Sequence, residues 1–394
     1  MRITRLLLVD DETNVLEGLR RLLRPLRGEW EVRTATSAVE ALALLGEQPA
    51  DVLITDMRMP VTDGGKLLAL VKERNPSTVR IVLSGQTDHA TALRVIPLAH
   101  QFLSKPCDPS DFIDTLRQIR DAIEALDDAT VGGSLVGAVG WLPAAPAIRA
   151  NLMEMLSDED AALHRVGQVI ETDPALATKF LQLTNSPFFG LRRRISSVVE
   201  ATSYLGLGVT KSVVVACAAT NGLLVRTPSF DAHAFQQRSA AVAHMARFIA
   251  PRHDQADDFF AAGLLHDIGT LLLASAMPAR FEMISRAAAI SGRKFAEEEQ
   301  IAGGCAPHRR LGVYLMKLWG LPRPVVEAIA NHPVAPTVEQ KRLGAAGAVY
   351  LAMQLLREAA EDESAAVDLD FIEAVGLGSK LEMWRARARE LVDA

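Results

Sequence analysis

The chain has 394 residues, more than one ordinary hydrophobic core organises, so its length predicts two or three domains. The composition is 49% hydrophobic and only 5% aromatic, which favours helix and argues against an all-β protein. A net charge of −6 argues against a surface that coats nucleic acid, because such binding requires clustered lysines and arginines. The cysteines are isolated in the sequence and the N-terminus has no long apolar run, so we expect a cytoplasmic protein without an export signal.

A regular alternation of short apolar runs with amphipathic stretches occupies residues 3–125. The apolar runs predict strands at residues 5–9, 31–34, 52–55, 80–83 and 101–103. The stretches between them predict helices, for example at residues 14–23 and 38–45. Strands and helices that alternate in this way form a parallel sheet with right-handed crossovers, and ligand chemistry then belongs at the carboxyl ends of the strands.

Side chains suited to phosphoryl chemistry follow four of these predicted strands. Asp10 and Asp11 follow the first strand, Asp56 the third, Ser84 the fourth and Lys105 the fifth. Because these strand ends converge, the carboxylates should share one cleft, where their mutual repulsion requires a cation, and Mg²⁺ prefers such ligands. Asp56 then suits the nucleophile, while the amine of Lys105 and the hydroxyl of Ser84 suit contacts to phosphoryl oxygens.

The segments LLLVDDE, LITDMRMPVTDG, IVLSGQ and FLSKP resemble the receiver domains of response regulators, over about the first 125 residues. The resemblance implies a flavodoxin-like, doubly wound sheet of five parallel strands in domain 1–125. It also implies phosphorylation of Asp56 by a sensor histidine kinase. The implied Mg²⁺ ligands are Asp10, Asp11, Asp56 and the backbone carbonyl of Arg58.

Three further positions follow from the same resemblance. Phe102 stands where receivers have their aromatic switch residue, and the Lys105–Pro106 bond stands where they have a cis peptide. Pro97 departs from the pattern, since proline should shorten the fourth helix and alter a face that receivers often use for dimerisation or output. A homodimer is therefore an open alternative with undefined geometry.

The segment after residue 125 changes character. Residues 127–140 are rich in glycine and lack periodicity, which predicts a linker at 126–140 that proteases should cut first. Beyond Trp141 only helical patterns remain, with a helix start at Asp173–Pro174 and a helix stop at residues 185–187. The longest apolar stretch, residues 259–277, contains His266 and Asp267, so we expect a buried helix pair and no membrane span.

The segments WLPAAPAI, IETDPALATKFLQLTNSPFFG, ATSYLGLG, FAAGLLHDIG and HRRLGVYLMKLWGLP resemble the HDOD domain, a relative of the HD metal-dependent phosphohydrolases. This resemblance implies an all-α, HD-like output domain at 141–335, followed by a C-terminal helical extension at 336–394. It implies an output by protein–protein interaction with a downstream signalling protein.

A group of histidines and one aspartate raises the question of a second metal, because imidazoles and a carboxylate suit Fe, Mn or Zn. HD phosphohydrolases need a later aspartate, yet residues 340–357 contain no acid, and Thr270 stands where the cyclic-dinucleotide phosphodiesterases have lysine. We therefore expect an open ligand shell, no tightly bound transition metal and no hydrolysis of a cyclic dinucleotide. His244 is expected to be a buried core residue on an apolar helix. The group comprises His244, His266, Asp267, His308 and His332.

Two alternatives to the protein-binding output stay open. The first is a metal-dependent cyclic-dinucleotide phosphodiesterase, which measured metal content would distinguish. The second is a DNA-binding transcription regulator, which is less favoured because the C-terminal region lacks a basic recognition helix and its arginines lie beside acids.

Overall fold

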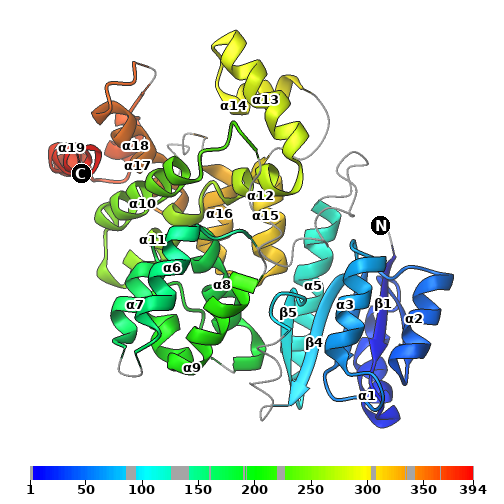
Figure 1. Ribbon diagram of the computed structural model, residues 1–394. Coiled ribbons are helices and arrows are strands. Elements are labelled where there is room, and N and C mark those ends of the chain that lie inside the picture. The colour runs from blue at the N-terminus through cyan, green and yellow to red at the C-terminus, as the bar shows by residue number, and fades with distance from the viewer. Residues whose placement is uncertain are drawn as a thin grey trace.

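The structure is a computed structural model in which an N-terminal sheet part is followed by a helical part (Figure 1). Strand β5 and helix α5 lie on the side of the sheet part that faces the helical part, and the C-terminus lies at the far end of the helical part (Figure 1). The predicted fold class, an α/β part followed by an all-α part, is confirmed. The described residues are 3–85, 95–125, 142–158, 161–189, 191, 193–219, 227–302, 308–332, 334, 342–363 and 365–393.

The sheet part contains five parallel strands in the order β2-β1-β3-β4-β5. Its central strands are apolar runs with almost no exposure, as expected for a sheet covered by helices on both faces. The order reverses between β1 and β3, and ligands of doubly wound sheets bind at the carboxyl ends flanking this reversal. The strands are β1 (Thr4–Val9), β2 (Trp30–Ala35), β3 (Val52–Asp56), β4 (Val79–Gly85) and β5 (Gln101–Lys105), and the helices are α1 (Thr13–Leu23), η1 (Arg24–Leu26), α2 (Ala38–Glu47), α3 (Gly64–Arg74) and α5 (Pro109–Ala125).

Each predicted strand is present and extends one or two residues beyond one or both of its expected ends. The cis peptide predicted between Lys105 and Pro106 is also present. The segment expected to form the fourth helix falls in part on residues 86–94, which lie outside the described residues, and residues 95–98 around Pro97 form a turn. The predicted linker at 126–140 also lies outside the described residues.

The helical part holds its elements around two hydrophobic clusters. The larger cluster continues from the sheet part into α8 and α15, and the smaller one joins α10, α17 and α19. The elements are α6 (Pro146–Met155), α7 (Leu163–Ile170), α8 (Pro174–Asn185), η3 (Pro187–Phe189), α9 (Val198–Ala219), α10 (Ala232–Ile249), η5 (His253–Gln255), α11 (Ala256–Leu265), α12 (Ile268–Ala276), α13 (Pro278–Ser291), α14 (Phe295–Ile301), α15 (His308–Leu318), α16 (Arg323–Asn331), α17 (Ala345–Ala359), α18 (Leu369–Ala374), η6 (Gly378–Lys380) and α19 (Leu381–Val392).

Helix α8 is surrounded by the rest of the protein, and every one of its residues is buried. Its start and stop agree with the sequence prediction: Asp173 caps the first turn, Pro174 is the first helical residue, and the helix ends at Asn185. The Asp173 carboxylate accepts hydrogen bonds from the amides of Ala175 and Leu176 at 2.9 and 3.0 Å. It also accepts from the Ala145 amide at 2.8 Å, so one side chain ties α8 to the segment that leads into α6.

Among the described residues, two helical stretches are long and apolar enough to cross a membrane. The stretch His253–Ala276 is 78% buried inside the protein and contains α11 and α12, the helix pair that the sequence predicts to be buried. The stretch Val198–Ala216 is 39% buried and is interrupted at Gly206, whose φ of 76° breaks the helix. Length and composition of one or two such helices are weak evidence for a membrane span.

Candidate functional site

The strand ends of the sheet part bring the predicted acid pocket together. Lys105 Nζ at the end of β5 lies 2.7 Å from the Asp10 carboxylate and 2.8 Å from that of Asp56. One carboxylate oxygen each from Asp10, Asp11 and Asp56 lie within 4.8 Å of one another. Ser84 is buried near the end of β4, which pairs with both β3 and β5. The sheet topology therefore collects side chains that are separated by up to 95 residues in the sequence.

The pKa values of Asp10 and Lys105 are shifted by burial and by their contact with each other. Burial raises the pKa of Asp10, and hydrogen bonds from Lys105 and from the Glu12 amide oppose that rise. Burial alone would lower the pKa of Lys105, but its hydrogen bonds to Asp10 and Asp56 raise it on balance. Three clustered carboxylates facing one ammonium retain an excess of negative charge, so the donor set fits a divalent cation such as Mg²⁺.

Two backbone features near Asp56 add to the pocket. The Arg58 amide donates a 3.0 Å hydrogen bond to the second carboxylate oxygen of Asp56, which fixes the orientation of that side chain. A Cβ atom at Gly64 would lie 2.1 Å from the Asp56 carbonyl oxygen, so only glycine lets α3 begin this close to β3. Sequence reasoning did not identify Gly64, although the Asp63-Gly64 pair that caps α3 was a usable signal.

Phe102 lies on β5 and is 1% exposed. Its ring centroid lies 6.3 Å from that of Phe188 in η3, which belongs to the helical part. The residue in the predicted switch position therefore contacts the part of the chain that would carry the output.

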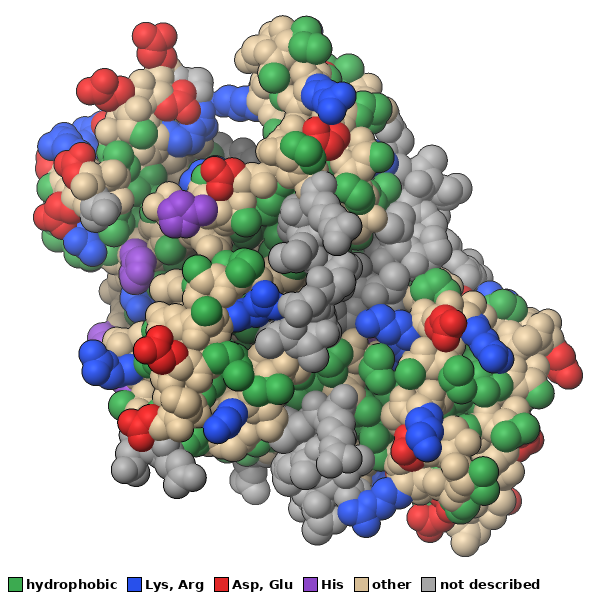
Figure 2. Space-filling view, viewed as in Figure 1, with side chains coloured by type: hydrophobic (Ala, Val, Ile, Leu, Met, Phe, Trp, Pro, Cys, Tyr) green, Lys and Arg blue, Asp and Glu red, His purple; other side chains and the backbone are tan. Residues whose placement is uncertain are grey.

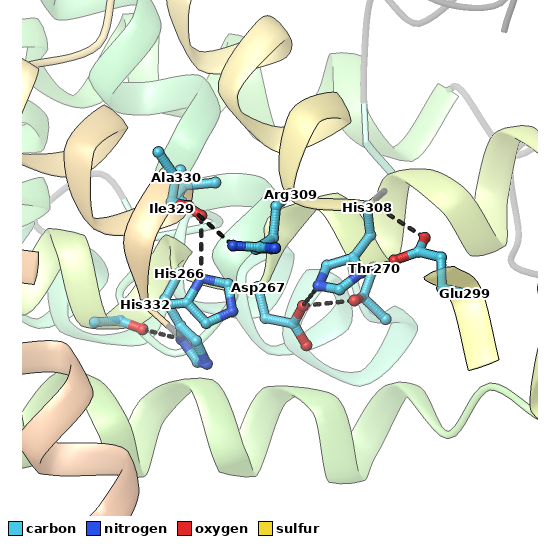
Figure 3. A network of polar contacts seen from close by, with 10 residues as sticks. His266, Asp267, Thr270, Glu299, His308, Arg309, Ile329, Ala330 and His332 are labelled. Carbon is cyan, nitrogen blue, oxygen red and sulfur yellow. Dashed lines mark hydrogen bonds and ion pairs between the residues drawn. The ribbon is translucent and has the colours of Figure 1, made fainter. Parts of the chain in front are cut away.

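The second predicted cluster is assembled at the junction of α11, α12, α15 and α16 (Figure 3). Ligand atoms of Asp267, His308 and His332 lie within 4.8 Å of one another, and His308 Nε2 lies 3.6 Å from an Asp267 oxygen. The ring of His266 lies 5.1 Å from that of His332, centroid to centroid. Four of the five predicted residues therefore come together, and three of them are histidines that are less than 10% exposed.

Each of these three histidines has its Nδ1 atom at an acceptor. His266 Nδ1 is 2.6 Å from the Gly263 carbonyl, and His332 Nδ1 is 3.1 Å from the Ile329 carbonyl. His308 Nδ1 is 2.7 Å from the Glu299 carboxylate (Figure 3). Because an acceptor at Nδ1 requires the proton there, the lone pair of each neutral imidazole is on Nε2, the arrangement of metal-binding histidines.

The histidines differ in how readily they take a proton. Burial lowers the pKa of His266, and burial together with the neighbouring His266 lowers that of His332 to about 3. Burial would also lower the pKa of His308, but Glu299 and Asp267 raise it on balance. His266 and His332 are therefore neutral at pH 7. His308 takes up a proton more readily than they do, because Glu299 and Asp267 lie beside it.

Glu299 is the residue of this cluster that sequence reasoning missed. It lies in α14, is 4% exposed, and accepts hydrogen bonds from both the backbone amide and Nδ1 of His308. The ligating aspartate of the HD phosphohydrolases was expected at residues 340–357, whereas Glu299 lies before His308 in the chain and accepts hydrogen bonds from that histidine. The run of three glutamates that contains it is typical of a solvated face, so no sequence signal distinguished it.

His244 and Thr270 are two further positions that the sequence analysis singled out in this region. His244 is exposed on α10, where its ring packs edge-on against Phe260 at 5.4 Å, so the expectation of a buried core histidine was wrong. It also lies outside the group formed by Asp267, His308 and His332. Thr270 donates its hydroxyl to Asp267, one turn away in α12 (Figure 3).

Gly269 explains how the helices of the cluster approach each other. A Cβ atom at this position would lie 1.8 Å from the backbone carbonyl oxygen of His308, far inside any van der Waals contact. Glycine therefore allows α12 to touch the first turn of α15, which places Asp267 beside His308.

Comparison with known proteins matches two families in series. The response regulator receiver domain matches residues 6–117, and the HDOD domain matches residues 142–334. The hydrogenase transcriptional regulatory protein HoxA of Cupriavidus necator is 45% identical over 121 residues, which cover 30% of this chain and 24% of HoxA. A second HoxA, from Bradyrhizobium diazoefficiens, is 27% identical over 40% of this chain and 33% of that protein, so the chain matches a third or less of either relative.

Solved structures give matches of the same kind. The MmoQ response regulator of Methylococcus capsulatus is 25% identical, with 64% of this chain and 98% of that chain covered at a TM-score of 0.48. The signal receiver domain of an HD domain-containing protein from Pseudomonas fluorescens Pf-5 is 35% identical, with 30% and 94% covered and a TM-score of 0.29. By its two family matches the chain belongs to the response regulators, with an N-terminal receiver domain followed by an HDOD domain.

Proposed function

We propose that this response regulator accepts a phosphoryl group on Asp56 from a histidine kinase or a small phosphodonor and transmits the signal through its HDOD domain. The observation that carries the proposal is Ser84 Oγ, which is buried and has no hydrogen-bond partner among the described residues. A buried hydroxyl without a partner is costly, and a phosphoryl oxygen on the nearby Asp56 would supply its acceptor. The acid pocket beside it already holds an amine that can contact the same phosphoryl group.

In this proposal Asp56 attacks phosphorus, and the bond between phosphorus and the donor breaks as the new carboxyl–phosphate bond forms. Lys105 Nζ moves from its carboxylate partners to a phosphoryl oxygen, while Ser84 donates to another. The Arg58 amide orients Asp56 for attack through its hydrogen bond to the other carboxylate oxygen. Mg²⁺, held by Asp10, Asp11, Asp56 and the Arg58 carbonyl, would neutralise the acids and the incoming phosphoryl charge.

The test compares Asp56→Asn with Asp63→Asn in the full chain, using acetyl phosphate and Mg²⁺. Asp56→Asn keeps the side-chain shape but removes the nucleophile, so phosphate incorporation measured by intact mass should fall to background. Asp63 is an exposed acid that caps α3, and asparagine caps equally well, so Asp63→Asn should incorporate phosphate normally. Undiminished phosphate in Asp56→Asn that survives hydroxylamine would contradict an aspartyl phosphate at this position.

For the output we propose protein–protein interaction in the cytoplasm with a downstream signalling protein. Lys and Arg side chains are interspersed with Asp and Glu on the face shown in Figure 2, which supports protein recognition over a DNA-coating surface. HoxA is named a transcriptional regulatory protein, so regulation of transcription by DNA binding is the alternative. An electrophoretic mobility shift on generic DNA that weakens steeply with salt would favour this alternative.

A second candidate function is binding of one transition-metal ion by the HDOD domain. The specific observation is that ligand atoms of Asp267, His308 and His332 lie within 4.8 Å of one another, and that Nδ1 of both histidines lies at an acceptor, which leaves the lone pair on Nε2. Glu299 would hold His308 as an outer carboxylate, while residues 340–357 still contain no acid to provide the further ligand that HD phosphohydrolases need. This candidate concerns binding, and the proposed output of the HDOD domain is still recognition of a protein partner.

A further inference from the structure

A groove between helices α6 and α7 is a feature of the helical part that the proposed function does not use. Its volume is about 610 Å³, within the range of about 300–1,000 Å³ that is usual for small-molecule sites. Helix α7 lies on the side of the helical part that faces away from the sheet part, so its wall of the groove is remote from the acid pocket (Figure 1). We call this site the α6–α7 groove.

Each helix presents one stripe of side chains to the α6–α7 groove. The residues within each stripe are spaced by three and four positions, which keeps their side chains on one face of a helix. The stripes are Ile148, Asn151 and Met155 from α6, and Arg165, Gln168, Val169 and Thr172 from α7 and the turn that follows it.

The opposite faces of both helices are fixed in the protein core. Leu152 on α6 and Ile170 on α7 have no exposed surface. A Cβ atom at Gly167 would lie 2.8 Å from the backbone of α9, so glycine lets α7 pack directly on that helix. The Asp173 carboxylate holds the segment that leads into α6 through the Ala145 amide. The groove is therefore pre-formed, and a ligand would bind without the cost of ordering its walls.

The lining carries one charge, the guanidinium of Arg165, and no acid. Several other arginines of the helical part pair with an acid three or four positions away, as Arg323 does with Glu327 and Arg387 with Glu390. No acid stands three or four positions from Arg165 on either side, and it makes no ion pair within the described residues. An unpaired guanidinium has a planar fork of N–H donors, which matches the two oxygens of a carboxylate.

The other polar side chains of the lining also bear on which head group fits. Asn151 and Gln168 carry amide N–H donors, and neither side chain has a hydrogen-bond partner in the part of the chain that the structure describes. Thr172 donates its hydroxyl to the Val169 carbonyl at 2.7 Å, so towards a ligand it can only accept. A guanidinium and two amides without any acid favour an anionic head group.

The floor of the groove is apolar. Ile148, Met155 and Val169 are partly buried and pack against the larger hydrophobic cluster. Ile148 and Met155 are seven residues apart, about 10 Å along α6, which matches an extended chain of about eight or nine carbon atoms. Covering these side chains with such a chain removes apolar surface from water and favours binding.

We propose that the α6–α7 groove binds a small organic carboxylate with an unbranched apolar chain. The carboxylate pairs with Arg165 and accepts from the amides of Asn151 and Gln168, while the chain covers the apolar floor. An acidic side chain of a protein partner has the same head group, but it lacks the chain that would cover about 10 Å of α6. The inference goes beyond phosphorylation of Asp56 and does not depend on it.

The first test compares head groups on one chain by calorimetric titration of the full-length protein. The probes are decanoate, its neutral analogue decanamide and its cationic analogue decylammonium. Decanoate should bind saturably with a Kd of about 1 mM or tighter, as expected for a ligand of this size. Decanamide should bind more weakly and decylammonium most weakly. Shortening the chain to octanoate and hexanoate should weaken binding by up to about fourfold per methylene.

The second test changes the charge in the groove. Arg165→Gln should weaken decanoate binding about fivefold, the upper range for an exposed ion pair, and should leave decanamide binding unchanged. Arg165→Glu should reverse the order of the head groups, so that decylammonium binds more tightly than decanoate. The matched control is Arg389→Glu, the same change at an exposed arginine of α19 outside the groove, which should keep the order of wild type.

The third test locates the ligand. Methyl groups of the methionines are labelled with carbon-13, and their resonances are followed by nuclear magnetic resonance as decanoate is added. The Met155 methyl signal, assigned by its loss in Met155→Leu, should move along the same binding curve as the calorimetric titration. Met283 is exposed on α13 outside the groove, and its signal should stay in place.

Several results would overturn the proposal. One is the absence of saturable decanoate binding, and another is equal binding of the three head groups, which would indicate unspecific apolar association. A Met155 signal that decanoate does not move would place the ligand elsewhere, and acetate binding as tightly as decanoate would remove the role of the apolar floor. Should the Arg165 variants lose their helical circular dichroism, the head-group series and the Met155 signal of wild type decide the question.

Discussion

Replacement of Lys105 by methionine should destabilise the receiver domain in the absence of Mg²⁺ and increase its response to the added cation. The amine bridges Asp10, which is 1% exposed, and Asp56, whose side chain is 10% exposed. Methionine fills a similar volume but leaves the carboxylates facing one another without a counter-charge. The loss is therefore electrostatic, and a divalent cation in the same pocket should offset it.

The magnitude follows from the burial of the pair. Removing one partner of a fully buried ion pair costs about 3–5 kcal/mol. The Lys105 side chain is 22% exposed, so screening reduces this cost, and we expect a loss of about 2–3 kcal/mol. At about 4 °C per kcal/mol for a domain of this size, the unfolding midpoint should fall by about 8–12 °C. Mg²⁺ at about 100 times its Kd contributes about 2.7 kcal/mol, which is enough to restore most of that stability.

The assay is thermal unfolding by circular dichroism at about pH 7 with and without Mg²⁺. The pKa of Lys105 is raised above its ordinary value of 10.5, so its stabilisation is complete below 10.5 and is lost only as pH rises through the raised value. Near neutral pH the amine is thus charged in both folded and unfolded states. The control is Lys66→Met, an exposed lysine of α3, which should change stability by no more than about 0.5 kcal/mol. A Lys105→Met protein as stable as wild type without Mg²⁺, or one that Mg²⁺ fails to stabilise, would refute the reasoning.

Three further predictions concern the HDOD domain. Gly269→Ala should lower the free energy of unfolding by about 1–3 kcal/mol or more, because its Cβ would meet the His308 carbonyl oxygen. Gly208→Ala, with no atom within 4 Å of the new Cβ, should instead raise it by about 0.5–1 kcal/mol in urea denaturation. Asp173→Ala removes a cap and leaves donors from α8 and Ala145 unpaired, so it should lower stability by about 2–4 kcal/mol, and a loss below about 0.5 kcal/mol would contradict this cost. Glu299→Gln should weaken Zn²⁺ or Mn²⁺ binding by about 10–100-fold in calorimetry, and a wild-type protein that binds neither ion would remove the metal candidate.

The sequence alone determined the local structure and the receiver pocket. Apolar runs of strand length between amphipathic stretches are sufficient to predict a parallel sheet, and the confirmed sheet then requires residues at the strand ends to converge. Asp10, Asp56 and Lys105 could be placed together because each directly follows or ends a strand whose position the pattern defines. The limits of α8 were predictable for a similar reason, since its cap and its stop are set by residues adjacent in the chain.

Only the tertiary structure decided which distant helices meet. Glu299 contacts His308 because α14 folds back on the start of α15, and nothing distinguishes its carboxylate from the two glutamates before it in the chain. His244 proved exposed because the apolar pattern of α10 does not specify which side of the helix the neighbouring helices cover. Gln101 and Leu318 are 217 residues apart, and their hydrogen bond depends on how the sheet part and the helical part pack together. Helix propensity and hydrophobic periodicity describe only neighbouring residues in the sequence. The contacts of Glu299 with His308 and of Gln101 with Leu318 depend on how distant elements pack, and a short sequence pattern does not encode that packing.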